Sequence, residues 1–388
     1  MKIPISKPYL GTQEQQAVVE VLASGWVVQG PRVAEFERRF AAYTGAPFAV
    51  ATTSCTTALH LALVASGIGP GDEVIVPAFT WVATANVVES LGAEPVFVDI
   101  ELETFNLEVS QIEAAIGPCT KALLPVSLFG HSAPMDAVMA IAARHHLKVV
   151  EDDACALGAW YGERHAGTLA DIGCFSFHPR KAITTGEGGM LITGDEKTAV
   201  LARSLRDHGA STSDLARHLG ARSYILPEFK VVGFNYRMTD LQGAVGVVQM
   251  ERLGRILEHR TRLARRYDEA LAGLGWLQPP RQEPGCRHGY QSYVCLFQPE
   301  QPGLDNLARL HARRNALMDD LEARGIATRP GTHAVHMLDY YHQKYRIKPE
   351  DCPNAYLADH LTITLPLYTQ MTPAEQDYVI AALRQWSG

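Results

Sequence analysis

The amino-acid sequence predicts an α/β protein with a large domain built on a mainly parallel sheet, followed by a smaller α+β domain. Short apolar runs alternate with helical patterns through the first two-thirds of the 388-residue chain, and these runs are apolar on both faces. Such runs, when joined by helices, are typical of parallel sheets covered on both sides. The length and a hydrophobic content of 47% are sufficient for a large core and for two domains.

The predicted elements of the large domain alternate between strands and helices. Strands are expected at Phe48–Thr52, Glu73–Pro77, Pro95–Asp99, Ala122–Val126, Lys148–Glu151 and Met190–Thr193. Helices are expected at Thr56–Ala65, Trp81–Leu91 and Met135–His145. In sheets of this kind, ligands bind at the carboxyl ends of the strands. Asp152, which ends its strand, is therefore well placed to face a ligand.

The smaller domain is expected to begin within a long helix that runs from Thr239 to about Leu271. We assign residues 13–250 to the large domain and residues 251–388 to the small one. A loop rich in Pro and Gly, a strand at Tyr293–Phe297 and a helix at Asn306–Arg324 follow the long helix. Its arginines are interpreted as a solvated face with local ion pairs rather than as a basic patch: Arg252, Arg255, Arg260, Arg262, Arg265 and Arg266.

Composition and charge narrow the range of partners. Charged residues make up 20% of the chain and its net charge is −7, which argues against a nucleic acid or an anionic membrane as partner. The N-terminus lacks an apolar core of signal-peptide length, and no apolar stretch approaches the ~20 residues of a membrane helix. We therefore expect a cytoplasmic protein. The seven cysteines include no Cys-x-x-Cys pair, so neither a disulfide framework nor a thiolate zinc site is indicated.

Lys181 is the most informative residue of the chain. It ends the segment Ser-Phe-His-Pro-Arg-Lys at Ser176–Lys181, and upstream an apolar run ends in the acids Glu151, Asp152 and Asp153. A lysine that can be desolvated forms a Schiff base with an aldehyde cofactor. A carboxylate at a strand end can hold a pyridine nitrogen protonated. Although a lysine alone would be interpreted as a surface residue, this combination is what pyridoxal 5'-phosphate (PLP) chemistry requires.

The segment continues after Lys181 as Ala-Ile-Thr-Thr-Gly-Glu-Gly-Gly, and the whole string closely resembles the DegT/DnrJ/EryC1/StrS family of PLP-dependent sugar aminotransferases. In that family the lysine of Ser-Phe-His-Pro-x-Lys is the Schiff-base residue. The resemblance extends from Ile3 to Tyr368, with several motifs in family order. It implies a PLP enzyme of fold type I, with a mainly parallel seven-stranded sheet flanked by helices. It also implies that residues 1–12 pack on the small domain.

The cofactor phosphate is expected at the start of the predicted helix at Thr56–Ala65, because exposed N–H groups at a helix start bind phosphate well. The family typically has Ser-Gly-Thr-x-Ala-Leu where this chain has Ser-Cys-Thr-Thr-Ala-Leu, so Cys55 replaces a glycine. The resemblance assigns phosphate contacts to Thr56, Thr57 and Ser176. Simple capping of the helix by Ser54 or Thr56 is the alternative interpretation.

Three further residues match family positions around the pyridine ring. Trp81 corresponds to an aromatic residue that stacks on the ring, although a tryptophan in an apolar segment is usually core. The frame Val-Val-Glu-Asp-x-Ala assigns the pyridine-nitrogen role to Asp152 rather than to Asp153. Cys155 stands where many relatives carry Gln, His or Glu, some of which bond the phenolic oxygen of the cofactor. Since a thiol is a weak donor, that contact is either lost here or supplied by another group.

The segment Gly-Phe-Asn-Tyr-Arg at Gly233–Arg237 matches another family signature. In relatives this loop crosses a dimer interface, and its asparagine touches the phosphate in the partner's site. The resemblance therefore implies a homodimer with shared active sites, in which Asn235 contacts the partner's cofactor. Arg237 would support the loop or bind an anionic donor. From the residues alone, Asn235 would be a turn residue and Arg237 a surface charge.

Arg329, His333 and His336 correspond to a stretch that relatives place near the sugar substrate. The two histidines could also be interpreted as a metal pair. No third ligand stands at a recognisable spacing, so we expect no metal.

The resemblance implies a ping-pong aminotransferase of amino-sugar biosynthesis, for a surface polysaccharide or a glycosylated natural product. The donor would be an amino acid, L-glutamate by analogy, and the acceptor a nucleotide-linked keto sugar. The freed Lys181 amine would move the donor's α-proton. A ketocyclitol acceptor and a PLP-binding sensor without turnover are the alternatives. Family dehydratases carry histidine at the position of Lys181, which argues against dehydration.

Overall fold

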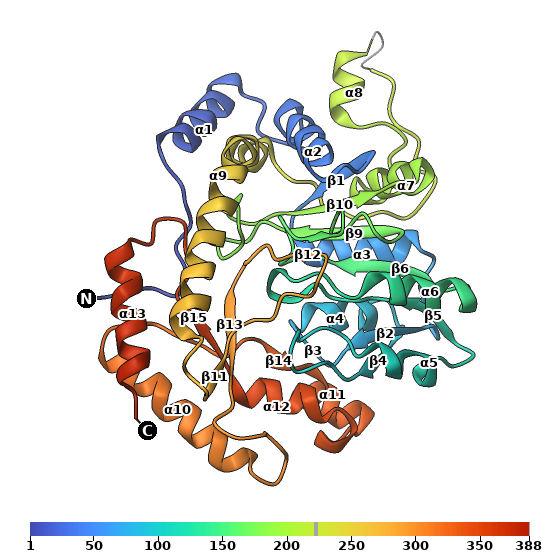
Figure 1. Cartoon of the computed structure of the whole chain (residues 1–388). Coiled ribbons are helices and arrows are strands. Elements are labelled where there is room, and N and C mark those ends of the chain that lie inside the picture. The colour runs from blue at the N-terminus through green and yellow to red at the C-terminus, as the bar shows by residue number, and fades with distance from the viewer. Residues whose placement is uncertain (221–223, 388) are drawn as a thin grey trace.

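A seven-stranded sheet forms the centre of the large part of the molecule in the computed structural model, which describes residues 1–220 and 224–387 (Figure 1). Its strand order is β1-β10-β9-β6-β5-β2-β4. The strands are β1 (Phe48–Thr52), β2 (Glu73–Pro77), β4 (Glu94–Val98), β5 (Thr120–Leu123), β6 (Lys148–Asp152), β9 (Ile172–Ser176) and β10 (Gly189–Thr193). Only β10 runs against its neighbours, and the other pairs are parallel. The predicted mainly parallel seven-stranded sheet is confirmed.

Successive residues of a strand point to opposite sides of the sheet, and here both sets are apolar. Helices therefore cover both faces. Val74 and Val150 face the layer that contains α3 (Cys55–Ala65), whereas Ile75 and Val149 face α6 (Met135–His145). The remaining helices of this part are α1 (Thr12–Ser24), α2 (Pro31–Thr44), α4 (Ala83–Glu89), α5 (Ile112–Ala115), α7 (Glu196–Arg206) and α8 (Asp214–Leu219). The molecule is thus layered as helix, sheet and helix, with apolar clusters on both sides of the sheet.

Several predicted boundaries differ from the structure, and two of these differences have clear local reasons. The strand expected to reach Val126 ends at Leu123, because Pro125 has no N–H to donate to a neighbouring strand. The helix expected from Trp81 begins at Ala83, so Trp81 lies in the short connection between β3 (Phe79–Thr80) and α4. This connection leaves the Trp81 side chain 55% exposed at the edge of the sheet.

The long helix predicted after Thr239 is confirmed as α9 (Asp240–Leu271). Thr239 caps it, because its hydroxyl oxygen accepts from the Gln242 N–H at 3.3 Å. Asp240 in turn accepts from the backbone N–H groups of Gly30 and Val33 at 2.8 and 2.9 Å, at the start of α2. The beginnings of the two helices are therefore fixed to each other.

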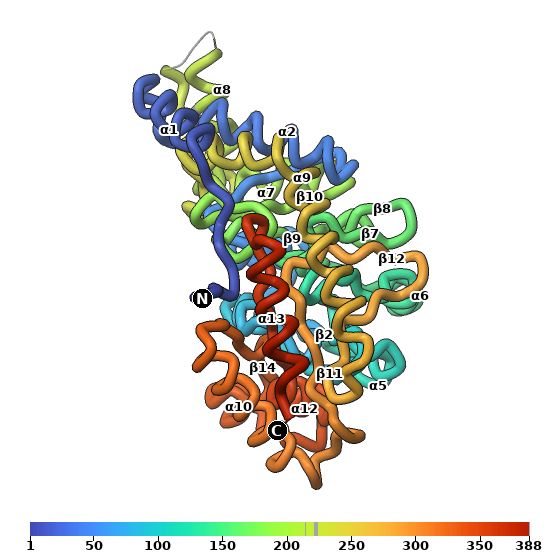
Figure 2. Tube along the Cα trace, turned by 60° about the vertical axis from the view of Figure 1, so that its left-hand side comes forward, coloured from blue at the N-terminus to red at the C-terminus, as the bar shows by residue number. Residues whose placement is uncertain are grey.

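The C-terminal part contains a three-stranded antiparallel sheet in the order β11-β13-β15. Its elements are β11 (Leu277–Gln278), β13 (Tyr293–Phe297), α10 (Leu307–Ala323), α11 (Asp339–Tyr345), α12 (Pro353–Leu361), β15 (Thr362–Leu365) and α13 (Pro373–Gln385). Ile3 pairs with Ile326 beside this sheet, and Figure 2 shows the N-terminus close to α13. The predicted domain boundary at residue 251 falls inside α9 and stays a prediction.

Short strand pairs join segments that are distant in the sequence. β12 (Cys286–Arg287) pairs with β7 (Trp160–Tyr161), which also pairs with β8 (Arg164–His165). β14 (His333–Ala334) pairs with β3, so the C-terminal part meets the edge of the large sheet. An apolar cluster with Phe79 and Phe129 from one side and Leu296 and Leu310 from the other fills this contact.

The interpretation of the α9 arginines as a solvated face is wrong for Arg260. Its side chain is 4% exposed and donates to the carbonyl oxygens of Tyr290 and Gln291 at 2.8 and 2.5 Å. Burial lowers its pKa to about 10. The ion-pair expectation holds for Arg262, which lies 3.7 Å from Glu258, and for Arg266, which pairs with Asp377.

Helix α8 projects from the body of the molecule in both views (Figures 1 and 2). The chain that follows exposes large apolar side chains, among them Tyr224, Leu226, Phe229 and Val232. Within the described residues, no helix is long and apolar enough to cross a membrane.

Candidate active site

A cavity of about 270 Å³ opens at the carboxyl ends of β6 and β9, beside the start of α3. The structure brings together seven of the predicted site residues in its lining: Thr56, Trp81, Asp152, Cys155, Ser176, Lys181 and Arg329. The other five do not line it: Thr57, Asn235, Arg237, His333 and His336. Residues far apart in the sequence therefore meet in one place, at the strand ends where ligands of parallel sheets bind.

Lys181 extends into this cavity from the turn that follows β9. Its backbone N–H donates to the His178 carbonyl oxygen at 2.8 Å, which fixes the turn. Its Nζ donates to Cys155 Sγ at 3.1 Å. The amine of Lys181 is thus half-buried, faces the cavity and contacts a thiol.

Asp152 lies 4% exposed at the end of β6, with its carboxylate oriented by two donors. Thr84 Oγ1 donates to Oδ2 at 2.8 Å, and the Ala154 N–H donates to Oδ1 at 3.1 Å. Burial raises the pKa of Asp152, and the bond from Thr84 and the charge of Lys181 oppose this rise. Thr84 was not predicted from the sequence. It is fully buried, and its hydroxyl also lies 2.9 Å from Thr80 Oγ1.

Asp153 differs from Asp152 in its surroundings. It is fully buried, does not line the cavity, and its pKa is raised well above its usual range, first by burial and then by the charge of Glu151. Glu151 accepts three backbone N–H bonds, from Gly167, Leu169 and Ala170 at 2.9–3.0 Å. The acid that reaches the cavity is therefore Asp152.

The start of α3 forms the other end of the cavity. Ser54 Oγ accepts from the Thr57 N–H at 3.2 Å, and Thr57 Oγ1 accepts from the Ser54 N–H at 3.0 Å. The capping expected of Ser54 is therefore present, and it leaves the hydroxyl of Thr56 exposed beside the cavity. Gly189 on β10 permits the close approach, because a Cβ there would lie 2.3 Å from the Ser54 carbonyl oxygen.

The rim of the cavity combines Trp81 with residues of the C-terminal part. His333 lies beside Trp81, with ring centroids 5.8 Å apart, because β14 pairs with β3. Thr332 Oγ1 donates to the Thr80 carbonyl oxygen at 2.9 Å and lines the cavity itself. His336 is instead fully buried near the ring of Phe97, where burial lowers its pKa to about 4.

The lining of the smaller cavity contains more lysine and arginine side chains than carboxylates. Lys181, Arg180 and Arg329 face the carboxylates of Asp152 and Glu187. Among the described residues, neither arginine forms an ion pair, and Nε of Arg329 is buried without a hydrogen-bond partner. An anionic ligand would satisfy these groups.

Gln291 is a second lining residue that was not predicted. It is 8% exposed, and its Nε2 donates to the Arg180 carbonyl oxygen at 2.9 Å. The buried guanidinium of Arg260 holds the Gln291 carbonyl oxygen, as described above. The chain of bonds therefore connects α9 to the loop that carries Lys181.

Asn235 and Arg237 lie outside this cavity, on the loop that precedes α9. Arg237 Nη1 pairs with Asp207 Oδ1 at 2.5 Å, so its guanidinium supports the loop. Asn235 is exposed, and its backbone forms a bridge with Asp207. The neighbouring Tyr236 carbonyl oxygen accepts from the Thr53 N–H at 3.0 Å, just before the start of α3.

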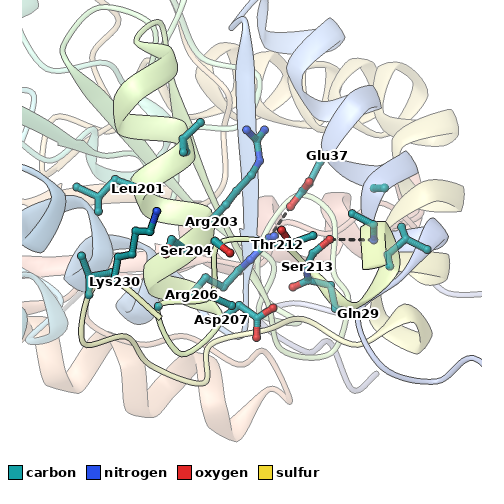
Figure 3. A pocket seen from close by; sticks show the side chains of 18 of the residues that line it. Gln29, Glu37, Leu201, Arg203, Ser204, Arg206, Asp207, Thr212, Ser213 and Lys230 are labelled. Atoms are coloured by element: carbon teal, nitrogen blue, oxygen red, sulfur yellow. Dashed lines mark hydrogen bonds and ion pairs between the residues drawn. The ribbon is translucent and has the colours of Figure 1, made fainter. Parts of the chain in front are cut away.

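A larger cavity of about 890 Å³ lies between α2 and α7 (Figure 3). Arg206 on α7 pairs there with Glu37 on α2 at 2.5 Å and donates to the Ala51 carbonyl oxygen at 2.7 Å. None of the predicted site residues lines this cavity. A large volume alone does not indicate a reaction, so the smaller cavity remains the candidate active site.

The residues of the smaller cavity fit PLP. The first N–H groups of α3 have no partners within the helix and lie beside the hydroxyl of Thr56, which suits a phosphate. A buried carboxylate at Asp152 suits a protonated pyridine nitrogen, and a primary amine at Lys181 suits an aldehyde. Gly189 provides the space for the turn that begins α3.

Fold and cavity together define the class of PLP-dependent enzymes whose amine-bearing lysine lies at the strand ends of a mainly parallel sheet. The model of the DegT/DnrJ/EryC1/StrS aminotransferase family matches residues 8–384. The chain belongs to this family and is a PLP-dependent aminotransferase.

Relatives match over nearly their whole length. The spore coat polysaccharide biosynthesis protein SpsC of Bacillus subtilis is 40% identical over 98% of this chain and 96% of its own. GDP-perosamine synthase of Caulobacter vibrioides is 40% identical over 99% and 98%.

Among solved structures, DesV of S. venezuelae, in complex with a ketimine intermediate, is 33% identical over 99% of this chain and 98% of its own, with a TM-score of 0.87. A Streptococcus pneumoniae protein in its PLP form is 30% identical over 98% and 97%, with a TM-score of 0.89.

Proposed function

We propose that this protein transfers the amino group of L-glutamate to a keto sugar linked to a nucleotide, by a ping-pong mechanism, in amino-sugar biosynthesis. The observation that carries the proposal is the meeting of Lys181 and Asp152 in one cavity at the strand ends. The names of the relatives support the acceptor class, since one is named for a GDP-linked product and another for polysaccharide biosynthesis. The unpaired arginines Arg180 and Arg329 support an anionic substrate.

Bound PLP supplies an aldehyde that carries the amino group between the two substrates and a ring that accepts electrons. Lys181 Nζ is the base of this reaction. It takes the proton from the α-carbon of the donor and, in the second half of the cycle, delivers a proton to the carbon of the acceptor. Its position in a half-buried pocket keeps the amine within reach of both substrates and limits access of water.

Asp152 provides the electrostatic part of the mechanism. Thr84 and the Ala154 N–H hold its carboxylate in one orientation, so it could accept a hydrogen bond from the protonated pyridine nitrogen without rearrangement. The hydroxyls of Thr56 and Ser176 and the start of α3 would bind the phosphate of the cofactor. Trp81, exposed at the rim, would cover its ring.

The active enzyme in this proposal is a homodimer in which each subunit completes the other's site. Asn235 is exposed on its own chain and does not line its own cavity, which suits a role in the partner's phosphate site. The exposed apolar side chains between residues 224 and 232 suit burial against a second copy. Arg237 supports the loop through Asp207.

The decisive experiment incubates the purified protein with L-glutamate and a panel of nucleotide-linked keto sugars. Single-turnover absorbance should show conversion of bound PLP by glutamate, and mass spectrometry should then detect an aminated nucleotide sugar. Amination of ketocyclitols instead would establish the alternative acceptor class. No conversion by any amino-acid donor would contradict the proposal and favour a PLP-binding sensor.

The role of Lys181 has its own test. Borohydride reduction of the wild-type protein should fix the cofactor covalently on the peptide that contains Lys181. Lys181→Ala should lose this attachment and all transamination, with an unchanged circular dichroism spectrum. Labelling of any other lysine would refute the assignment.

A further inference from the structure

The cavity around Lys181 contains two thiols as well as the reactive amine. Cys155 is half-buried and faces the cavity, with its Sγ 3.1 Å from Lys181 Nζ. Cys55, the first residue of α3, lines the same cavity and is 8% exposed. At this distance the nitrogen and the sulfur need little movement to form a bond, and thiols react with oxidants as thiolates. The pair therefore combines an amine with an oxidisable sulfur.

Cys155 is the thiol of this cluster best placed for reaction. Burial raises the pKa of Cys55 well above its usual range, as it does for the fully buried Cys174 nearby. Burial therefore disfavours the reactive thiolate form of both. Cys155, in contrast, is accessible from the cavity and contacts the amine directly.

We propose that Cys155 and Lys181 form a peroxide-sensitive pair that closes into a sulfur–nitrogen linkage and thereby disables the enzyme. The first step needs hydrogen peroxide, which oxidises the Cys155 thiol to a sulfenic acid as its O–O bond breaks and one water leaves. In the second step, Lys181 Nζ attacks the sulfur. The S–N bond forms, the S–O bond breaks, and the hydroxide leaves with an amine proton as a second water. The product is a sulfenamide, so sulfur is oxidised by two electrons and peroxide is reduced by two.

The linkage requires a free Lys181 amine, and here the inference rests on the proposed function. While the lysine is bonded to the cofactor aldehyde, its nitrogen cannot attack the sulfur. The donor amino acid releases the lysine, so it should make the enzyme sensitive to peroxide. A thiol reductant reverses the linkage: it attacks the sulfur, frees the amine as a mixed disulfide forms, and a second thiol restores Cys155.

The test treats the holoenzyme with hydrogen peroxide before and after its conversion by L-glutamate, followed by alkylation of free thiols and peptide mass spectrometry. The expected product is a species that joins the Cys155 and Lys181 peptides with the loss of two hydrogens. The glutamate-treated enzyme should yield several times more of it than the untreated holoenzyme. Dithiothreitol should release both peptides and restore activity. A Cys55–Cys155 disulfide, or oxidation of Cys155 without any link to Lys181, would overturn the proposal.

Matched variants separate this pair from other cysteine chemistry. Cys155→Ser should abolish the linked species, and peroxide should remove a much smaller fraction of whatever activity this variant has. Cys119→Ser, at an exposed cysteine outside the cavity, should form the linkage like the wild type. An unchanged fractional loss in Cys155→Ser would contradict the proposal.

A cofactor-free preparation distinguishes the two hypotheses. If glutamate fails to convert the cofactor but cofactor-free protein still forms the linkage, the proposed donor fails and the Cys155–Lys181 pair stands. If glutamate converts the cofactor but neither the converted nor the cofactor-free enzyme forms the linkage, the pair fails and the proposed donor stands.

Discussion

Two adjacent aspartates at the end of β6 experience opposite environments. Asp152 lines the cavity, and its carboxylate is held by Thr84 and the Ala154 N–H. Asp153 lies on the other side of the strand, fully buried next to Glu151, and burial together with the charge of Glu151 raises its pKa well above its usual range. Because only Asp152 reaches the cavity, it alone is placed to meet the pyridine nitrogen of a cofactor bound there, as the proposed function requires.

Replacing each aspartate by asparagine should therefore have unequal effects. Asp152→Asn removes the anionic partner of the ring nitrogen and should lower turnover by orders of magnitude. Asp153→Asn replaces an acid outside the cavity by an amide of the same shape, and turnover should change little. Steady-state kinetics with each variant saturated in PLP would check this, and equal losses would mean that the choice between them is wrong.

The sequence predicted the residues that carry recognisable chemistry, but it missed those that act only by position. Lys181 and Asp152 could be found because their segments have distinctive patterns. Thr84 lies 68 residues from the carboxylate that it orients, and a threonine in an apolar segment has no distinguishing pattern. Gln291 reaches the cavity only because Arg260 and the Arg180 carbonyl oxygen hold it there. Such contacts arise from packing between distant segments.

At the scale of single elements, β6 combines a ligand-facing acid with an acid that fixes the neighbouring chain. Glu151 is fully buried and accepts backbone bonds from Gly167, Leu169 and Ala170. These bonds hold the turn that leads into β9, and β9 ends at Ser176, five residues before Lys181. Burial nevertheless raises the pKa of Glu151 from 4.5 to about 7. The stability of β6 and of the turn that Glu151 holds should therefore depend on pH.

The raised pKa of Glu151 predicts a stability change with a definite sign. Above about pH 4.5 the Glu151 carboxyl loses its proton in the unfolded state but keeps it in the folded state. The contribution of Glu151 to the free energy of unfolding is therefore complete below about pH 4.5 and is lost as the pH rises through about 7. The loss is on the order of 3 kcal/mol. Glu151→Gln should lower the melting temperature at every pH. The melting temperature of this variant should also fall less steeply than that of the wild type between these two pH values. The exposed control Glu163→Gln should keep the wild-type slope, and an equally steep fall in Glu151→Gln would contradict the assignment.

Prediction of whole elements succeeded where one periodic pattern dominated. The 3.6-residue period located α9 to within a residue, and the doubly apolar runs located the parallel strands β2, β4, β5 and β6. They missed β9, which is parallel to β6. The burial of Arg260 could not be predicted, because it depends on the carbonyl oxygens of a loop 30 residues away. The position of Trp81 outside its helix likewise depends on β14, which pairs with β3 from more than 250 residues further along the chain.

At the scale of the whole molecule, the proposed phosphate site draws on two chains, because Asn235 does not line the cavity of its own chain. The start of α3 and the hydroxyls of Thr56 and Ser176 provide donors, but a phosphate dianion has several acceptor oxygens. Asn235 carries an exposed amide on a loop fixed by the Arg237–Asp207 pair. The proposed homodimer would bring this amide to the partner's phosphate. Loss of one donor to a charged group typically costs ~1.5–3 kcal/mol. Asn235→Ala should therefore weaken PLP retention by roughly tenfold or more.

Mixing inactive subunits tests whether Asn235 acts across the dimer. A heterodimer of Lys181→Ala and Asn235→Ala chains would place both defects in one site and leave the other intact. With random exchange of equal amounts, about a quarter of the sites should then be active. The PLP concentration must be low enough that Asn235→Ala alone is nearly inactive. Lys181→Ala mixed with Asp152→Asn is the control and should recover nothing, because both residues lie in the cavity of their own chain. If subunit exchange is demonstrated but the Asn235→Ala mixture also recovers nothing, Asn235 serves its own chain's site or neither.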